Sequence, residues 1–173
     1  MKSIGLSIVM CLATLLFTGC ASLPPAAERV PTVAIDNTSG TTLGRAIDPL
    51  VNEHSGLSGF YALKEGIEAY AARLLLVQNA DKSLDLQYYI WKDDLTGKTL
   101  LTQVLAAADR GVRVRLLLDD LDTTDEDDLL HVLDAHPNIE IRLFNPFANR
   151  GNRLLDFITD SSRVNRRMHN KSL

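Results

Sequence analysis

The residues with the clearest capacity for chemistry are a histidine and a lysine two positions apart, His169 and Lys171, in the segment MHNKSL that ends the sequence. Residues two apart in a strand point to the same face, so a strand here would present an imidazole beside an ammonium group. A neutral imidazole can attack phosphorus as a nucleophile, while an ammonium group stabilises the negative oxygens of the transition state. The spacing suits phosphoryl chemistry, and by spacing alone the alternative is a chance pair in a solvated tail.

Periodic segments before this pair predict the elements that must position it. Apolar residues at helical or alternating spacing predict, in order, a helix at about 60–79, a strand at 84–91, a helix at 98–110, a strand at 112–119, a helix at about 126–135, a strand at 139–144 and a short helix from 154 to about 164. Gly111 is expected to end the second helix as a left-handed cap. Strand, helix and strand at these lengths form a βαβ unit with parallel pairing. The predicted fold is therefore α/β, with a fourth strand just beginning at 166.

Four segments in this order resemble a known family, namely SLDLQYYIW, GVRVRLLLDD, IRLFNP and NRRMHNKSL. Together they resemble the N-terminal half of a phospholipase D superfamily member, of the bacterial kind grouped with cardiolipin synthases, from about residue 60 to the last residue. The resemblance implies a bilobed α/β protein, of which this chain is one lobe: a mostly parallel mixed sheet flanked by helices, incomplete at the C-terminus. Members of the family usually carry the motif His-x-Lys-x4-Asp twice, with both copies in one site.

The resemblance also implies a mechanism and roles for His169 and Lys171, which match the motif histidine and lysine. One motif histidine attacks the phosphodiester to form a phosphohistidine, the other protonates the leaving alcohol, and water or a second alcohol then takes the phosphatidyl group. Which of these two roles belongs to His169 stays open. No cofactor and no metal are implied.

The sequence departs from the family pattern after Lys171. The motif Asp would fall at the fifth residue after Lys171, the chain ends two residues after it, and a second motif is absent. We therefore expect an N-terminal fragment whose missing C-terminal lobe is needed to complete the site. The expected activity of the complete parent is phosphodiester hydrolysis or phosphatidyl transfer on phospholipids. The alternatives are an inactive truncated lobe and a nuclease of the phospholipase D type.

The N-terminus predicts export and a lipid anchor. Residues 1–19 have one lysine, an apolar stretch and small residues before Cys20, which is typical of a secretory signal peptide and resembles the lipobox of bacterial lipoproteins. We expect Cys20 to be lipidated, residues 20–58 to form a tether rich in Pro, Thr and Ser, and residues 59–173 to form the domain. Ala21 and Ser22 favour the outer membrane, facing the periplasm. The alternative is an ordinary secretory signal cleaved elsewhere.

Charge is unevenly distributed along the chain. The formal net charge is −4, which together with a membrane anchor makes nucleic acid an unlikely partner and a phospholipid the expected substrate. Residues 119–140 contain nine acidic residues and no lysine or arginine, whereas residues 142–171 contain seven basic residues. An anionic ligand would therefore be drawn to the C-terminal part.

The acidic run that begins at Asp119 has two interpretations. Oxygen ligands at alternating positions suggest a calcium site, but the run lacks the central Gly and final Glu of an EF-hand loop. We favour a solvated loop whose acids cap the following helix, with Thr124 or Asp125 as N-cap. Asp119 lies at the end of a predicted parallel strand, where α/β sheets gather ligands, so a supporting role in the site is also considered.

Five arginines and three aromatic residues each have a functional and a structural interpretation, and three histidines have a structural one. Arg150, Arg153, Arg163, Arg166 and Arg167 form either a phosphate-attracting rim or a solvated surface with ion pairs to Asp156 and Asp160. The aromatic residues of the first strand, Tyr88, Tyr89 and Trp91, are favoured as core over a wall for an acyl chain or headgroup. The histidines without partner spacing, His54, His131 and His136, are expected on the surface.

Overall fold

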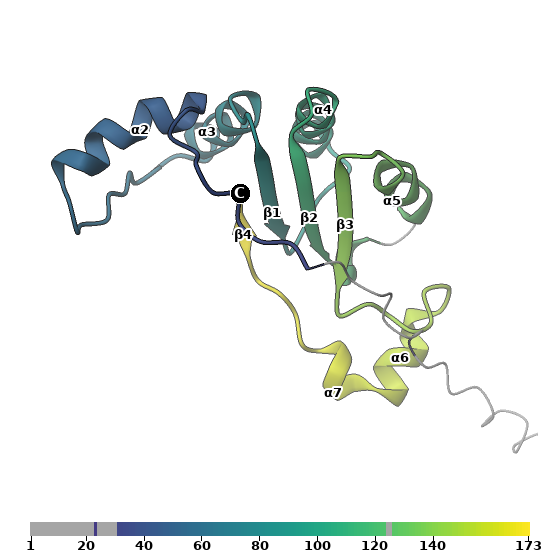
Figure 1. Ribbon diagram of the computed structural model, residues 1–173. Coiled ribbons are helices and arrows are strands. Elements are labelled where there is room, and N and C mark those ends of the chain that lie inside the picture. Colours follow the sequence, from purple (N-terminus) through teal and green to yellow (C-terminus); the bar gives the residue numbers. More distant parts are fainter. Residues whose placement is uncertain (1–22, 24–30, 124–125) are drawn as a thin grey trace, which may run out of the picture.

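The computed structural model describes residues 23, 31–123 and 126–173 (Figure 1). Its helices are α2 (Thr42–Glu53), α3 (Gly66–Gln78), α4 (Leu95–Asp109), the 3-10 helix η1 (Asp120–Asp122), α5 (Asp127–Asp134), α6 (Arg153–Thr159) and α7 (Ser161–Val164). Its strands are β1 (Ser83–Tyr88), β2 (Arg113–Asp119), β3 (Ile139–Phe144) and β4 (Lys171–Ser172). Over residues 31–123 and 126–173, no helix is long and apolar enough to cross a membrane.

These strands form a four-stranded sheet in the order β3-β2-β1-β4. β1 and β3 both pair in parallel with the central strand β2, so that Leu116 lies between Leu86 and Ile141. β4 runs antiparallel to β1 at the sheet edge. This arrangement confirms the predicted α/β fold with a mostly parallel mixed sheet flanked by helices.

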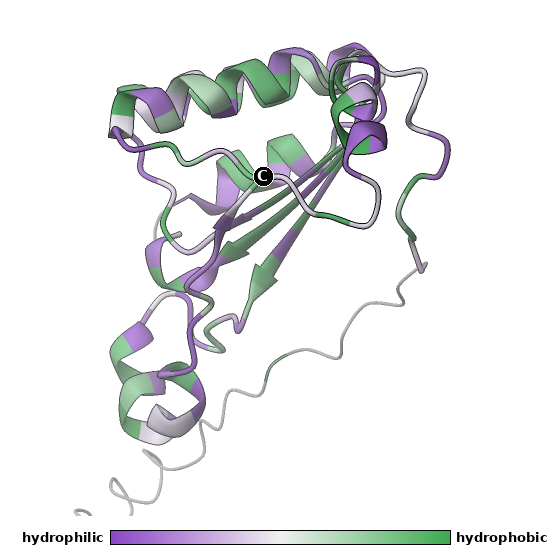
Figure 2. Ribbon diagram, turned by 90° about the vertical axis from the view of Figure 1, so that its left-hand side faces the viewer, coloured by the Kyte–Doolittle hydropathy of each residue, from purple (hydrophilic) through white to green (hydrophobic). Residues whose placement is uncertain are grey.

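One face of the sheet builds the core, because alternate residues of β1, β2 and β3 are apolar (Figure 2). Leu86 and Val114 are almost fully buried on this face, against Val77 of α3 and Val104 of α4. Burying a side chain of this size stabilises a protein by about 1.5–3 kcal/mol. The core therefore fixes β1 and β2 firmly beneath the helices.

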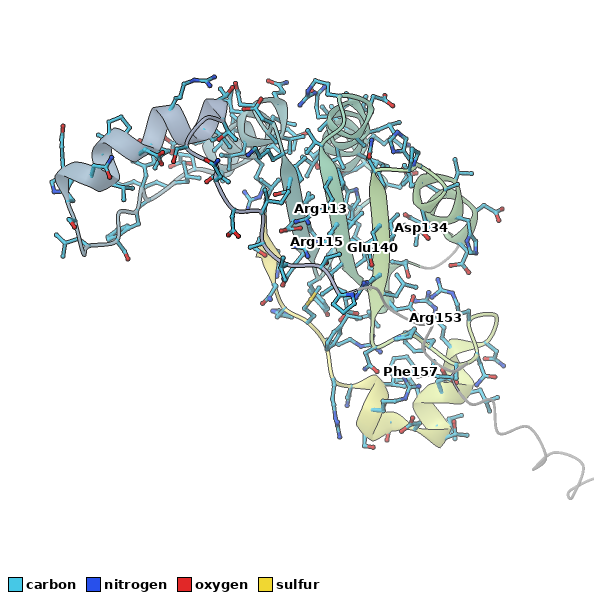
Figure 3. All side chains as sticks on the ribbon, viewed as in Figure 1. Arg113, Arg115, Asp134, Glu140, Arg153 and Phe157 are labelled. Carbon is cyan, nitrogen blue, oxygen red and sulfur yellow. The ribbon has the colours of Figure 1, made fainter. Side chains whose placement is uncertain are left out.

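The opposite face of the sheet is polar (Figure 3). Arg115 forms a bidentate ion pair with Asp85 on the neighbouring strand, and its other amino group donates to the hydroxyl oxygen of Thr32 at 2.8 Å. Arg113 donates to the carbonyl oxygen of Val33 at 3.2 Å. The chain just before α2 is therefore fastened across this polar face.

The ends of the predicted elements differ from those observed. The helix predicted from about 60 begins at Gly66, and the strand predicted to reach 91 ends at Tyr88. The single helix predicted from 154 to about 164 is divided into α6 and α7, because Asp160 leaves the helical region with φ −144° and ψ 45°. Gly111 has φ +92°, which confirms the predicted left-handed cap.

The segment predicted as a tether contains the helix α2. Its N-cap is Thr41, whose hydroxyl oxygen accepts a hydrogen bond from the Gly44 amide at 2.9 Å. The expectation of a segment with little periodicity was wrong here, because apolar residues recur at helical spacing within an otherwise Pro-, Thr- and Gly-rich stretch. The signal peptide and Cys20 lie outside the described residues, so they and the tethering role stay predictions.

Candidate active site

His169 and Lys171 lie at the edge of the sheet beside the end of β1. Lys171 begins β4 and pairs with Tyr88, while His169 lies just before the strand. A fourth strand is present, as predicted, but it begins at Lys171 and not at 166, because residues 166–170 form no ladder with β1. Both side chains of the pair are exposed.

The ring of Tyr89 contacts both members of the pair. Its centroid lies 4.3 Å from that of the His169 ring, with an angle of 38° between the planes. The ammonium nitrogen of Lys171 lies 5.3 Å from the same centroid, within the range of a cation–π interaction. The structure therefore brings the imidazole and the ammonium group together against one aromatic ring.

The backbone beside Tyr89 holds the residue between the pair. The Tyr89 amide donates to the carbonyl oxygen of Asn170 at 2.9 Å, and the Asn170 side chain donates to Oε1 of Gln87 at 2.9 Å. These bonds extend the pairing of β1 with β4 by one residue. They fix the segment that carries His169 from the C-terminal side.

The three aromatic residues of β1 and its end have different environments. Tyr88 and Trp91 lie on the core side of the sheet, with ring centroids 4.9 Å apart in an edge-to-face arrangement. This confirms the core interpretation for those two residues. Tyr89, which follows the strand, is half-buried and contacts His169.

Asp119 holds the same segment from the N-terminal side. Its carboxylate is almost fully buried at the end of β2 and accepts hydrogen bonds from the Met168 amide at 2.8 Å and from Arg167 at 3.0 Å. A third bond comes from the Leu121 amide at 2.9 Å. The position of Asp119 at the end of a parallel strand was the sequence signal for this role.

The neighbouring acid, Asp120, is fully buried and organises a different loop. One of its oxygens accepts from the Phe147 amide at 2.7 Å, and the other contacts Arg150, Arg153 and the Thr123 hydroxyl. The prediction of a solvated acidic loop was therefore wrong for Asp119 and Asp120. The reason is that arginines more than 25 residues later in the chain fold back onto them.

The acidic run was also predicted to cap the following helix, with a calcium site as the alternative. The predicted N-cap residues, Thr124 and Asp125, lie outside the described residues, and Glu126 precedes α5 without a side-chain cap bond. Within the described ranges, 31–123 and 126–173, no three His, Cys, Asp or Glu side chains are grouped so as to hold a metal ion.

Four of the five arginines proposed for a phosphate rim are engaged in ion pairs. Arg150 pairs with Asp120 and Asp127, Arg153 with Asp120, and Arg167 with Asp119. Arg163 pairs with both of the predicted acids, Asp160 and, at 3.9 Å, Asp156. Figure 3 shows Arg153 near α6, below the end of the sheet. The ion-pair interpretation is favoured, although its acids are mainly Asp119, Asp120 and Asp127. Arg166 is exposed.

The carboxylate of Asp156 is buried beside this arginine cluster. Burial by itself raises the pKa of Asp156. Hydrogen bonds from the Asn149 side chain and from the Asn149 and Ala148 amides, together with the charge of Arg163, lower the pKa by more than burial raises it. The pKa of Asp156 therefore lies below its usual value. Asp156 therefore stays ionised and holds the turn between β3 and α6.

The remaining histidines have no role at the site. His54 and His131 are exposed, as predicted. His136 is half-buried: its Nδ1 accepts from the Asn138 amide at 3.1 Å, and its Nε2 lies 3.2 Å from Asp109. It is therefore a structural contact between α4 and the start of β3.

Comparison with known proteins finds relatives among bacterial cardiolipin synthases. It is 55% identical over 130 residues to cardiolipin synthase C of Escherichia coli K12, covering 75% of this chain and 28% of that protein. It is 34% identical over 110 residues to cardiolipin synthase B of the same organism, covering 63% and 25%, and 36% identical over 167 residues to an uncharacterised Helicobacter pylori J99 protein, covering 92% and 32%. The chain thus spans about a quarter to a third of the length of these relatives.

Other comparisons add little to this relationship. No family model matches the chain. A solved structure of TrmBL2, an archaeal chromatin protein, aligns with a TM-score of 0.39 and 17% identity over 61% of this chain and 42% of that one, which is too low a likeness to support any inference.

The relatives named cardiolipin synthase agree with the family resemblance of the sequence. The chain therefore belongs to the phospholipase D superfamily, among its bacterial cardiolipin synthase-like members.

Proposed function

We propose that the protein carrying this chain transfers or hydrolyses phosphatidyl groups of phospholipids. The observation that supports this proposal is the placement of His169 and Lys171 against the ring of Tyr89, in a chain 55% identical to a cardiolipin synthase. The exposed position of both side chains leaves them accessible to a phosphodiester at the sheet edge.

The proposed reaction has two steps through a phosphohistidine. A ring nitrogen of one motif histidine attacks phosphorus, the bond between phosphorus and the leaving alcohol oxygen breaks, and the second histidine gives that oxygen a proton. Water or another alcohol then attacks phosphorus, loses its proton to the second histidine, and breaks the phosphorus–nitrogen bond. His169 takes one of these two roles.

Lys171 has an electrostatic role in this proposal. The non-bridging phosphate oxygens gain negative charge in the transition state, and an ammonium group beside the imidazole stabilises them. The contact of Lys171 with the Tyr89 ring keeps the ammonium group at the ring that also contacts His169. A second His-x-Lys-x4-Asp copy, from outside these residues, supplies the other histidine.

We further propose that Cys20 is lipidated and holds the domain at a membrane, facing the periplasm from the outer membrane. A lipid anchor raises the local concentration of a phospholipid substrate. Cys20→Ala should release the protein from the membrane fraction. Retention of the Cys20→Ala protein in that fraction would contradict the anchor without affecting the proposed chemistry.

The test of the activity uses the full-length protein with phosphatidylglycerol vesicles. Thin-layer chromatography of the products should show cardiolipin or phosphatidic acid, and His169→Ala should lower the rate by about 10³-fold or more. The matched control is His131→Ala, an exposed histidine, which should keep the wild-type rate.

Three other results would overturn or redirect the proposal. Lipid turnover that survives His169→Ala would exclude the role of His169. Cleavage of single-stranded DNA in place of lipid would support the nuclease alternative. A folded full-length protein without activity on either substrate would support the alternative that the protein is not a catalyst.

A further inference from the structure

We propose that Asp119 is a positioning residue for His169. Its carboxylate holds the two residues that immediately precede the histidine, through the Met168 amide and the Arg167 guanidinium. The consequence for catalysis rests on the proposed function, whereas the positioning itself can be tested without any activity.

The carboxylate of Asp119 is buried, and both of its oxygens are occupied by hydrogen bonds. Asp119 is 1% exposed, and both of its oxygens accept hydrogen bonds: one from Met168, the other from Arg167 and Leu121. Hydrogen bonds to an ionised, buried carboxylate are short and strong compared with bonds between neutral groups. Met168 is also buried, so water does not compete for its amide.

The order of the strands separates β2 from the segment that carries His169. β1 lies between β2 and β4, so the β2 backbone has no ladder with the segment that carries His169. The β4 ladder covers only Lys171 and Ser172, with one further bond from Tyr89 to Asn170. On the N-terminal side of His169, Asn145 after β3 also holds the chain, through the Arg166 carbonyl oxygen at 2.8 Å and through Arg167 at 3.4 Å. Asp119 is the group that holds Met168, the residue next to the histidine.

The residues on both sides of His169 are held by backbone hydrogen bonds. Asp119 holds Met168, and the Tyr89 amide holds Asn170. The backbone of the histidine is therefore restrained at both neighbouring residues by the rigid ends of β1 and β2. Catalytic groups lose about 10²-fold in rate when displaced by about 1 Å, so this restraint has a large effect on the proposed reaction.

Arg167 connects the same carboxylate to the loop after β3. Its guanidinium lies 3.0 Å from Asp119 and 3.4 Å from the Asn145 carbonyl oxygen, and its carbon centre lies 4.8 Å from the centroid of the Phe147 ring. The ends of β2 and β3 are thereby joined to the His169 segment. Asp119 is at the centre of this arrangement.

Asp120 supplies a matched control in the next position. It is equally buried and also paired with arginines, but its partners are Arg150, Arg153 and the Phe147 amide, and none of them adjoins His169. Asp119→Asn and Asp120→Asn each remove one buried charge of the same size. Only the first change removes hydrogen bonds made by residues 167 and 168.

The test measures hydrogen–deuterium exchange of the full-length protein by mass spectrometry. Asp119→Asn should raise the exchange rate of amides in 166–170 by about 10-fold or more, which is the loss of one hydrogen bond to a charged group. Asp120→Asn should raise exchange in 147–153 and leave 166–170 unchanged. Exchange in β2 reports the global stability of each variant.

A second variant keeps the test decisive if Asp119→Asn does not fold. Asp119→Glu retains the charge beside Arg167 and displaces the carboxylate by one methylene group, so exchange in 166–170 should still rise. The proposal is overturned if 166–170 exchanges as in the wild type in the folded variant, or if Asp120→Asn raises exchange there to the same extent.

Measuring kcat and KM of the same variants distinguishes failure of the positioning role of Asp119 from failure of the proposed function. With phosphatidylglycerol, Asp119→Asn should lower kcat by about 10- to 100-fold at unchanged KM, while Asp120→Asn, compared at equal folded fraction, keeps the wild-type kcat. A wild-type protein without lipid activity would refute the proposed function, and the exchange measurement would still decide the role of Asp119. An unchanged kcat in an active protein would overturn that role.

Discussion

The ring of Tyr89 lies 4.3 Å from the ring of His169, centroid to centroid, at an angle of 38°. This contact joins the residue that follows β1 to a residue two positions before β4. Because Lys171 lies on the same ring, one aromatic side chain sets the relative position of the two groups proposed for phosphoryl chemistry.

Replacing Tyr89 tests this contact. Tyr89→Leu removes the ring face, so we expect kcat/KM on phosphatidylglycerol to fall by about 3- to 10-fold, corresponding to a cation–π and stacking contribution of about 0.5–1.5 kcal/mol. Tyr89→Phe keeps the ring and serves as the control, with kcat/KM close to that of the wild type. Equal losses in both variants would instead assign the effect to the phenolic hydroxyl.

Replacing Asp120 tests the buried ion pairs that hold the loop after β3. Asp120→Ala leaves Arg150 and Arg153 without their shared buried carboxylate, so the free energy of unfolding in urea should fall by about 3–5 kcal/mol. The control is Asp127→Ala, which removes a half-exposed partner of Arg150 and should cost less than about 1 kcal/mol. Similar losses in the two variants would show that burial of Asp120 contributes little.

Replacing Glu126 should stabilise the protein at neutral pH, whereas replacing Asp120 should destabilise it. Burial, together with the charges of Asp93 and Asp122, raises the pKa of Glu126 above its usual value, and Lys92 offsets this only in part. The folded protein therefore binds this proton more tightly than the unfolded chain, and the resulting stabilisation is present at low pH and lost as pH rises through the folded pKa.

Glu126→Gln should accordingly raise the free energy of unfolding at pH 7, by less than about 1 kcal/mol. The same substitution should have no stabilising effect below about pH 4, where the carboxyl is protonated in both states. Urea unfolding at the two pH values makes the measurement. Destabilisation by Glu126→Gln at pH 7 would contradict the sign of the pKa shift.

Gly111 tests the connection between α4 and β2. Its φ of +92° is unfavourable for any residue with a Cβ atom, although no atom lies within 4 Å of the position that a Cβ would take. Gly111→Ala should therefore destabilise the protein by about 1–2 kcal/mol through backbone strain alone. The control is Gly151→Ala, which has open space and no positive φ, and its midpoint of thermal unfolding should stay within a few degrees of the wild-type value.

Local sequence patterns predicted most of the regular elements. The alternation in 84–91 and 112–119 and the helical spacing in 98–110 gave β1, β2 and α4 within a few residues, because each pattern reflects one apolar face against a common core. The helix α2 was missed because Pro, Thr and Gly dominate its surroundings. The break between α6 and α7 was missed because Asp160, which interrupts them, has no strong local signal for a break.

By itself, the sequence determined the parallel βαβ order and the placement of a histidine and a lysine two residues apart, since both depend on short-range spacing. Only the tertiary structure decided that Asp119 and Asp120 are buried, that the arginines near 150 and 167 pair with them, and that Tyr89, unlike Tyr88, contacts His169. These contacts join residues 27 to 80 positions apart. Which partners meet depends on the order of the strands and on where each strand ends, because side chains at those ends meet only after the sheet has formed.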